Sequence, residues 1–209
     1  MYTGTGQALA INNGIDLDGE GGLTWFKSRP SGNHNLIDTE RGNTKYLRSN
    51  TTDAEGTNTG YLTSFNSNGF TLGTSGTLNS TQDYASWSFR KAPKFFDVVT
   101  YTGNGIAGRT VAHNLGSVPG MVLVKQTNAA TIWPVYHRGV NGGTNPENYL
   151  LYINGTAAQI DNDTYWNDTA PTDSVFTVGT NSNVNTSGGT YVAYLFAHND
   201  SGDGEFGPD

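Results

Sequence analysis

Apolar and polar residues alternate along many short segments of this chain, a pattern typical of β-strands with one buried face. In the segment 84–90, Ala85, Trp87 and Phe89 alternate with other residues, so we predict a strand with these three side chains on the core face. Residues 23–26 (LTWF) and 121–124 (MVLV) are apolar on both faces, which predicts central strands covered on both sides. No segment of helical length has the helical period, and Asn-Gly, Gly-Gly and Ser-Gly turns recur throughout. The pattern therefore predicts an all-β fold.

The two halves of the sequence repeat each other in the same order. Residues 2–6 (YTGTG) recur as 101–105 (YTGNG), and residues 70–74 (FTLGT) recur as 176–180 (FTVGT). The spacing between matching segments grows along the chain, which assigns short insertions to the turn-rich segments 142–147 and 167–172 of the second half. We predict two tandem β-sandwich, jelly-roll-like domains related by internal duplication. They cover residues 1–93 and 94–199, and residues 200–209 are expected to be a linker toward a further domain.

Composition and charge narrow the classes of partner. Only 14% of the residues are charged and the net charge is −7, so the basic surface that nucleic acid requires is missing. No apolar run is long enough to span a bilayer, and the first residues do not resemble a signal peptide. An aromatic content of 11% argues against disorder. We therefore expect a folded protein that binds no nucleic acid and does not insert into membranes.

Recognised catalytic motifs are missing from the sequence. The four histidines do not fall at metal-ligand spacings, and no nucleophile elbow or phosphate-binding glycine loop occurs. We predict no catalytic residue and no cofactor. A pair of distant carboxylates for glycoside hydrolysis remains an open alternative, because such pairs carry no local signature.

Asp16, Asp18 and Glu20 are the only weak candidates for a calcium site. They alternate beside a glycine, but the segment lacks the twelve-residue ligand pattern of a calcium loop and its terminal glutamate. We favour a simple turn before the strand at residues 22–27 and predict no metal.

Tryptophans are the natural candidates for ligand contact, and the repeat helps to sort them. Trp25, Trp87 and Trp166 align with apolar residues of the other half, so we assign them to the core. Trp133 has no clear apolar counterpart, since it aligns with His34 or one of the two residues that follow it. With Tyr136 and His137 it is the predicted ligand-binding group.

Several stretches resemble the tandem repeat domains of tail-fibre-like and other virion structural proteins of aquatic bacteriophages, including marine and cyanobacterial phages. They cover nearly the whole chain and are residues 56–74 (ending YLTSFNSNGFTLGT), 87–105 (WSFRKAPKFFDVVTYTGNG), 113–120 (HNLGSVPG) and 165–199 (YWNDTAPTDSVFTVGTNSNVNTSGGTYVAYLFAHN). The resemblance implies a virion component made without a signal peptide and released into the medium by host lysis. It implies no residue-level role.

The sequence is compatible with three functions. The leading hypothesis is a non-enzymatic structural or adhesive module of a phage fibre that contributes to host-surface attachment. Its expected partners are other virion proteins, copies of itself and a host-surface glycan. The alternatives are a carbohydrate-binding module of a secreted protein and a glycan-degrading fibre domain.

Overall fold

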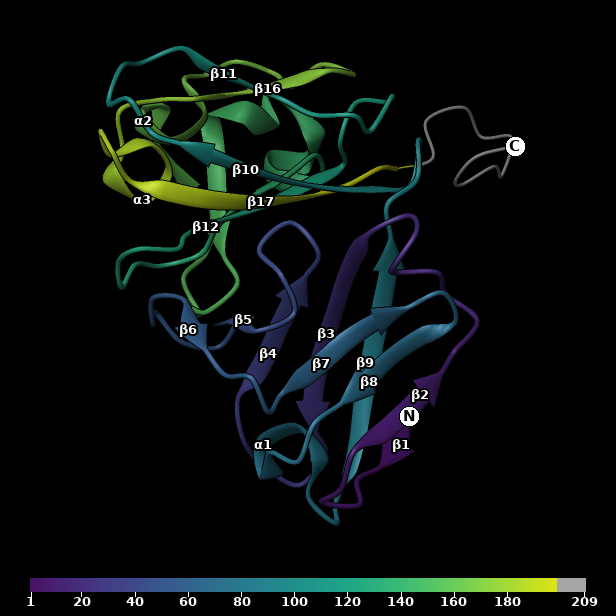
Figure 1. Ribbon diagram of the computed structural model, residues 1–209. Coiled ribbons are helices and arrows are strands. Elements are labelled where there is room, and N and C mark those ends of the chain that lie inside the picture. The colour runs from purple at the N-terminus through teal and green to yellow at the C-terminus, as the bar shows by residue number, and fades with distance from the viewer. Residues whose placement is uncertain (199–209) are drawn as a thin grey trace. The chain divides into compact units, whose positions relative to one another are not determined.

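The computed structural model describes residues 1–198 and confirms an all-β protein built from antiparallel sheets (Figure 1). The chain divides into two compact units, Met1–Lys91 (unit 1) and Ala92–Asp209 (unit 2), and each is described by itself. The predicted linker at residues 200–209 lies outside the described residues. No helix within residues 1–198 has the length and apolar character needed to cross a membrane.

Unit 1 contains two antiparallel sheets. The larger has six strands in the order β1 (Tyr2–Thr3), β9 (Asp83–Arg90), β3 (Gly22–Ser28), β4 (His34–Asp38), β5 (Lys45–Arg48) and β6 (Gly56–Thr57). The smaller has three strands in the order β2 (Leu9–Asn12), β8 (Gly69–Leu72) and β7 (Leu62–Asn66), and the short helix α1 (Gly76–Asn79) follows β8. Figure 1 shows β7 and β8 lying across β3 and β9.

The two sheets of unit 1 pack face to face, because each has one apolar side. Phe26 of β3 meets Phe70 of β8 edge to face, with ring centroids 5.2 Å apart and planes at 88°. The core residues come from both sheets and from α1 and the connecting loops: Leu17, Phe26, Ile37, Tyr61, Leu62, Phe70, Leu72 and Leu78. Unit 1 is therefore a β-sandwich.

Unit 2 has a six-stranded sheet of the same kind. Its order is β10 (Phe96–Thr102), β17 (Thr190–Phe196), β12 (Met121–Gln126), β13 (Pro134–His137), β14 (Tyr149–Tyr152) and β15 (Ile160–Asp161). A two-stranded sheet is formed by β11 (Arg109–Ala112) and β16 (Val175–Val178). Four short helices complete the described part of the unit: η1 (Val140–Gly143), η2 (Pro146–Asn148), α2 (Asp163–Trp166) and α3 (Ser182–Asn185).

The core of unit 2 lies between its large sheet and the layer formed by β11, β16 and α2. Val122 and Val124 of β12 share this core with Phe176 and Val178 of β16. Trp166 of α2 is also buried there, and its indole Nε1 donates a hydrogen bond to the Tyr149 carbonyl at 3.1 Å. The prediction that Trp166 is a core residue is confirmed.

The segments that we assigned to insertions lie outside the strands of unit 2. Residues 142–147 fall in η1, in η2 and between them, on the connection from β13 to β14. Residues 167–172 connect α2 to β16. Both places tolerate changes in length, because they add no residue to a strand.

A cluster of two tyrosines, one asparagine and one glycine recurs in both units, and we call it the Tyr–Asn cluster. In unit 1, Tyr2 of β1 stacks on Tyr84 of β9, with centroids 5.0 Å apart and planes 8° apart. Asn79, at the end of α1, accepts a hydrogen bond from the Thr5 backbone N–H at 2.8 Å. The same Asn79 donates to the Gly73 carbonyl at 2.7 Å. The cluster thus ties the strand β1, the helix α1 and the loop after β8 together.

Unit 2 builds the same cluster from the matching residues. Tyr101 of β10 stacks on Tyr191 of β17, with centroids 5.0 Å apart and planes 13° apart. Asn185 of α3 accepts from the Asn104 N–H at 2.9 Å and donates to the Gly179 carbonyl at 2.8 Å. Burial raises the pKa of Tyr101 well above its ordinary value, mainly through desolvation, so the hydroxyl stays protonated.

The glycine of the Tyr–Asn cluster is Gly4 in unit 1 and Gly103 in unit 2, and close main-chain packing requires it. A Cβ atom on Gly4 would lie 1.9 Å from the Ser80 carbonyl oxygen, and one on Gly103 would lie 2.2 Å from the Thr186 carbonyl oxygen. Both distances are far below van der Waals contact, so only glycine fits. This contact explains why the sequence Tyr-Thr-Gly recurs in both halves.

The predicted orientation of β9 is wrong. Tyr84 lies on the face that carries Phe26 and is buried, whereas Trp87 lies on the opposite, outer face and is 50% exposed. In unit 2 the β17 residues Tyr191, Ala193 and Leu195 belong to the core cluster, and Val192 and Tyr194 on the other face are buried as well. The alternation in β9 was read correctly but its phase was reversed, because large side chains occupy both faces of that strand.

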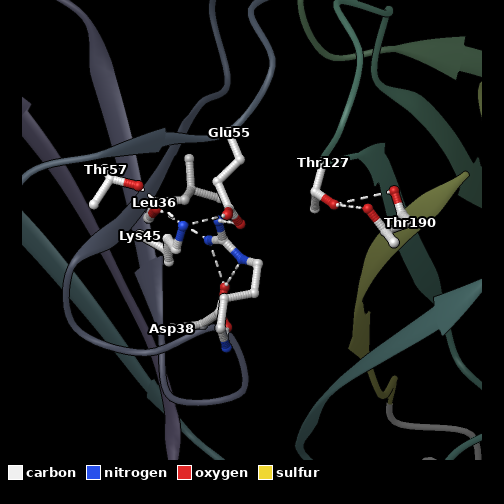
Figure 2. Close-up of polar contacts among 8 residues, drawn as sticks. Leu36, Asp38, Lys45, Glu55, Thr57, Thr127 and Thr190 are labelled. Carbon is white, nitrogen blue, oxygen red and sulfur yellow. Dashed lines mark hydrogen bonds and ion pairs between the residues drawn. The ribbon is translucent and has the colours of Figure 1, made fainter.

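An ion network fixes the end of β4 in unit 1 (Figure 2). The Arg41 guanidinium donates from Nε to Asp38 Oδ2 at 2.7 Å and from Nη1 to Glu55 Oε2 at 3.2 Å. Lys45 Nζ lies 3.4 Å from Glu55 Oε1. The Asp38 and Arg41 side chains are almost wholly buried, and buried charges of this kind are stable when paired and hydrogen-bonded. The Asp38 carboxylate is therefore neutralised within unit 1.

Candidate functional site

Two tryptophans lie side by side on the outer face of the large sheet of unit 1. The β-ladder pairs Trp25 of β3 with Trp87 of β9, so both side chains leave the same face. Their rings meet edge to face, with centroids 6.5 Å apart and planes at 67°. Trp25 is half-buried and Trp87 is half-exposed, which leaves indole surface open to solvent.

These rings line a hollow of about 350 Å³ together with Phe89, Lys27 and His34. We call it the Trp25–Trp87 hollow. The register explains its composition, since Lys27 pairs with His34 across β3 and β4 and Phe89 lies two residues beyond Trp87 on β9. The volume falls at the lower end of the range for small-ligand sites. An apolar aromatic floor with two polar side chains suits a small ligand of mixed character.

The polar side chains of the hollow retain hydrogen-bonding capacity. Lys27 Nζ donates to the carbonyl oxygens of Ser28 and, at 3.5 Å, of Gly32. An ammonium group has three N–H donors, so one has no partner among the described residues. Desolvation, followed by the charge of Lys27, lowers the pKa of His34, which favours the neutral ring at neutral pH.

The corresponding face of unit 2 carries buried rings in place of a hollow lined by exposed ones. Leu123 pairs with Tyr194 and Val135, as Trp25 pairs with Trp87 and Leu36 in unit 1. Trp133 precedes Val135 by two residues, as His34 precedes Leu36, so Trp133 stands at the position of His34. The Trp133 and Tyr194 rings lie 6.4 Å apart with planes at 16° and have no exposed surface.

The lysine of this face is also used differently in the two units. Lys125 takes the position of Lys27 but is fully buried. Its Nζ donates to the Thr131 carbonyl at 2.9 Å, to Thr131 Oγ1 at 3.1 Å and to the Ala129 carbonyl at 3.4 Å. Lys125 therefore binds the loop that leads to Trp133, whereas Lys27 keeps a donor available.

The three residues that the sequence predicted as a ligand-binding group do not share one surface. Trp133 is buried, and its backbone N–H donates to Asn154 Oδ1 at 3.0 Å. Tyr136 belongs to the core of unit 2, where it meets Trp166 edge to face, and burial raises its pKa to about 12. His137 is exposed and accepts a hydrogen bond from the Gly139 N–H at 3.0 Å. The exposed aromatic site lies in unit 1 instead.

The acidic segment before β3 forms a turn closed by the Asp16 side chain. Asp16 Oδ1 accepts a hydrogen bond from the Gly19 N–H at 2.8 Å, while Asp18 and Glu20 are exposed. Within residues 1–198, no group of three His, Asp or Glu side chains is arranged to hold a metal ion.

The sequence did contain a signal for the Trp25–Trp87 hollow, and we misread it. Tyr2 and Tyr84 of unit 1 are identical to their counterparts Tyr101 and Tyr191, and they build the fold. Trp25 and Trp87 are replaced by Leu123 and Tyr194. At these two positions the tryptophans are particular to unit 1, and Trp87 leaves half of its surface in solvent there.

Comparison with known proteins gives a family and nothing narrower. Neither the curated proteins nor the solved structures give a significant match to the chain. A family model matches residues 1–207, a range that includes residues of both units. The chain belongs to the family described as Domain of unknown function (DUF7483).

Proposed function

We propose that this chain is a non-enzymatic structural and adhesive module of a bacteriophage virion fibre, which attaches to a host-surface glycan through the Trp25–Trp87 hollow. The virion assignment rests on the resemblance to phage fibre repeats given above. In this proposal the chain reaches the medium by host lysis, and its other partners are virion proteins or copies of itself. The adhesive role rests on one observation, the half-exposed indole of Trp87 beside Trp25.

The physical argument concerns what such a surface can bind. An indole is large and mostly apolar, so its burial would stabilise the fold. Half of the Trp87 side chain stays in water instead, and this part of the fold is therefore not optimised for stability. Sugar rings present flat C–H faces that stack on aromatic rings and hydroxyl groups that need polar partners. The hollow offers both, with Trp25 and Trp87 as the apolar floor and Lys27 and His34 as polar groups.

We further propose that the two units arose by internal duplication. Their six-stranded sheets have corresponding strand orders, and the Tyr–Asn cluster is repeated with the same stacking and the same asparagine contacts. An experimental structure should superpose β3 on β12 and β9 on β17 within one alignment. A superposition that required a different strand order would contradict the duplication.

Glycan binding is tested on the whole chain with arrays of bacterial surface polysaccharides. We expect binding that Trp87→Ala abolishes while the far-ultraviolet circular dichroism stays unchanged. Ile106→Ala is the matched control, because it also removes exposed apolar surface but lies in unit 2, and it should bind normally. The absence of binding to any glycan, or equal loss in both variants, would contradict the adhesive role.

The free-standing carbohydrate-binding module is the second candidate, since the same exposed tryptophan favours it. The two are separated by where the chain is found after host lysis. A fibre module should co-sediment with intact virions in a density gradient, and a secreted module should stay in the soluble fraction. Release of reducing ends from a bound polysaccharide would instead support the glycan-degrading alternative.

A further inference from the structure

We infer that the Trp25–Trp87 hollow selects saccharides that carry a carboxylate, such as hexuronic acids, with Lys27 as the charged contact and His34 as a neighbouring hydrogen-bond donor. This inference rests on the proposed glycan binding and names the chemical class of the ligand. It follows from which charges line the hollow and which donors remain available there.

Lys27 supplies a positive charge whose position is fixed. Its ammonium group is held at the end of β3 by the Ser28 and Gly32 carbonyls, and one N–H has no partner among the described residues. Holding the group in place before binding reduces the entropy lost when a ligand engages it. A carboxylate is the natural acceptor, since charge-assisted hydrogen bonds are about twice as strong as neutral ones.

His34 extends the polar side of the hollow. It lies directly across from Lys27 in the β3–β4 ladder, and its ring makes no hydrogen bond to any described residue. A neutral imidazole has one N–H donor and one acceptor nitrogen. It can therefore bind a carboxylate oxygen or a ring hydroxyl beside the one that Lys27 contacts.

The local charge excludes the other common ligand of aromatic sites. Quaternary ammonium groups bind to cages of aromatic rings, but here Lys27 would repel a cation. Among the described residues, those that line the hollow include no carboxylate, and the buried Asp38 on the same face is neutralised by Arg41. A locally positive site stands out on a chain of net charge −7, so the hollow favours an anionic sugar.

The test compares each acidic oligosaccharide with its own methyl ester, which keeps the ring and removes the charge. The probes are oligogalacturonate, oligoglucuronate and oligomannuronate, titrated against the full chain by calorimetry. We expect at least one acid to bind roughly tenfold more tightly than its ester, with affinity falling as salt is added. Lys27→Gln should remove this preference, and Lys27→Arg should largely retain it.

Two further variants test whether the effect is specific to the Trp25–Trp87 hollow. Lys45→Gln removes a lysine of the same unit that lies outside the hollow, and it should leave the preference for acids unchanged. His34→Trp introduces the residue that unit 2 has at this position and should fill the hollow, which would abolish binding of acid and ester alike.

The outcomes distinguish this inference from the proposed function. Binding that depends on Trp87 but is equal for acid and ester would overturn the selectivity and leave glycan binding intact. A preference for acids that survives in Lys27→Gln would show that the charge comes from elsewhere and would also overturn the inference. Failure of every glycan to bind would refute the proposed adhesive function itself.

Discussion

Truncation of Asn185 to alanine tests whether the Tyr–Asn cluster holds unit 2 together. The Asn185 amide donates to the Gly179 carbonyl at 2.8 Å and to the Ile106 carbonyl at 2.9 Å, and its oxygen accepts from the Asn104 N–H at 2.9 Å. The side chain is fully buried, so Asn185→Ala leaves three main-chain groups without their partner.

The magnitude follows from how well water can replace the lost partner. The hydrogen bond to Gly179 is buried, and leaving a buried carbonyl unsatisfied costs about 2 kcal/mol. The bonds to Ile106 and Asn104 are only partly buried, so each contributes about 0.5 kcal/mol after rehydration. Asn185→Ala should therefore destabilise unit 2 by about 3 kcal/mol, a large share of the stability of a small domain.

Hydrogen exchange followed by mass spectrometry measures this loss within the intact chain. Peptides from β12 and β17 should lose about a hundredfold in protection, since about 1.4 kcal/mol corresponds to a factor of ten. Peptides from β3 and β9 of unit 1 provide the reference. The matched control is Asn183→Ala on the same helix, whose partly exposed amide contacts the Tyr165 hydroxyl, and it should cost about 1 kcal/mol or less. Equal losses in the two variants would refute the reasoning.

Three further predictions concern packing, exposure and pH. Gly103→Ala should lower the free energy of unfolding by about 2 kcal/mol or more in a urea titration, because its Cβ would clash with the Thr186 carbonyl, and a neutral result would contradict that contact. Trp87→Ala should change the same quantity by less than about 1 kcal/mol, whereas a loss of about 3 kcal/mol or more would mean that the indole is buried. Burial lowers the pKa of His113 below its ordinary value of 6.5, so the unfolded chain takes up a proton first and stability should fall as the pH decreases below about 6.5. Replacement by His113→Gln should flatten this part of the pH profile, and an unchanged slope between pH 7 and pH 5 would contradict the assignment.

The all-β fold could be predicted because its determinants are local. Alternation over a few residues and frequent turn dipeptides indicate strands and hairpins without any knowledge of distant contacts. The order of the strands could not be predicted in this way, because it depends on contacts between distant residues. In the β1–β9 pair, Tyr2 lies opposite Tyr84, with more than 80 residues between them in the sequence. Such pairing depends on the whole sheet. The sequence repeat indicates only that both halves have the same order of strands, not what that order is.

The phase of a strand is harder to predict than its period. Strand β9 carries Tyr84 on one face and Trp87 on the other, and both residues favour burial. The contacts of Tyr84 decide which face of β9 is buried. Tyr84 stacks on Tyr2, and its hydroxyl donates a hydrogen bond to the Gly76 carbonyl at 3.1 Å. A tyrosine can be buried only when its hydroxyl finds such an acceptor, which the sequence alone does not display.

The candidate site depends on a difference between the units that is invisible in either half alone. At the position where unit 1 has His34, unit 2 has Trp133, whose ring lies against Tyr194 and is buried with it. In unit 1 the smaller imidazole leaves Trp25 and Trp87 lining an open hollow. At this register position a histidine accompanies an open hollow in unit 1, and a tryptophan accompanies buried rings in unit 2. The Tyr–Asn cluster lies on the opposite, core side of the sheet in both units, so a change of residue at this outer position does not remove any of its contacts.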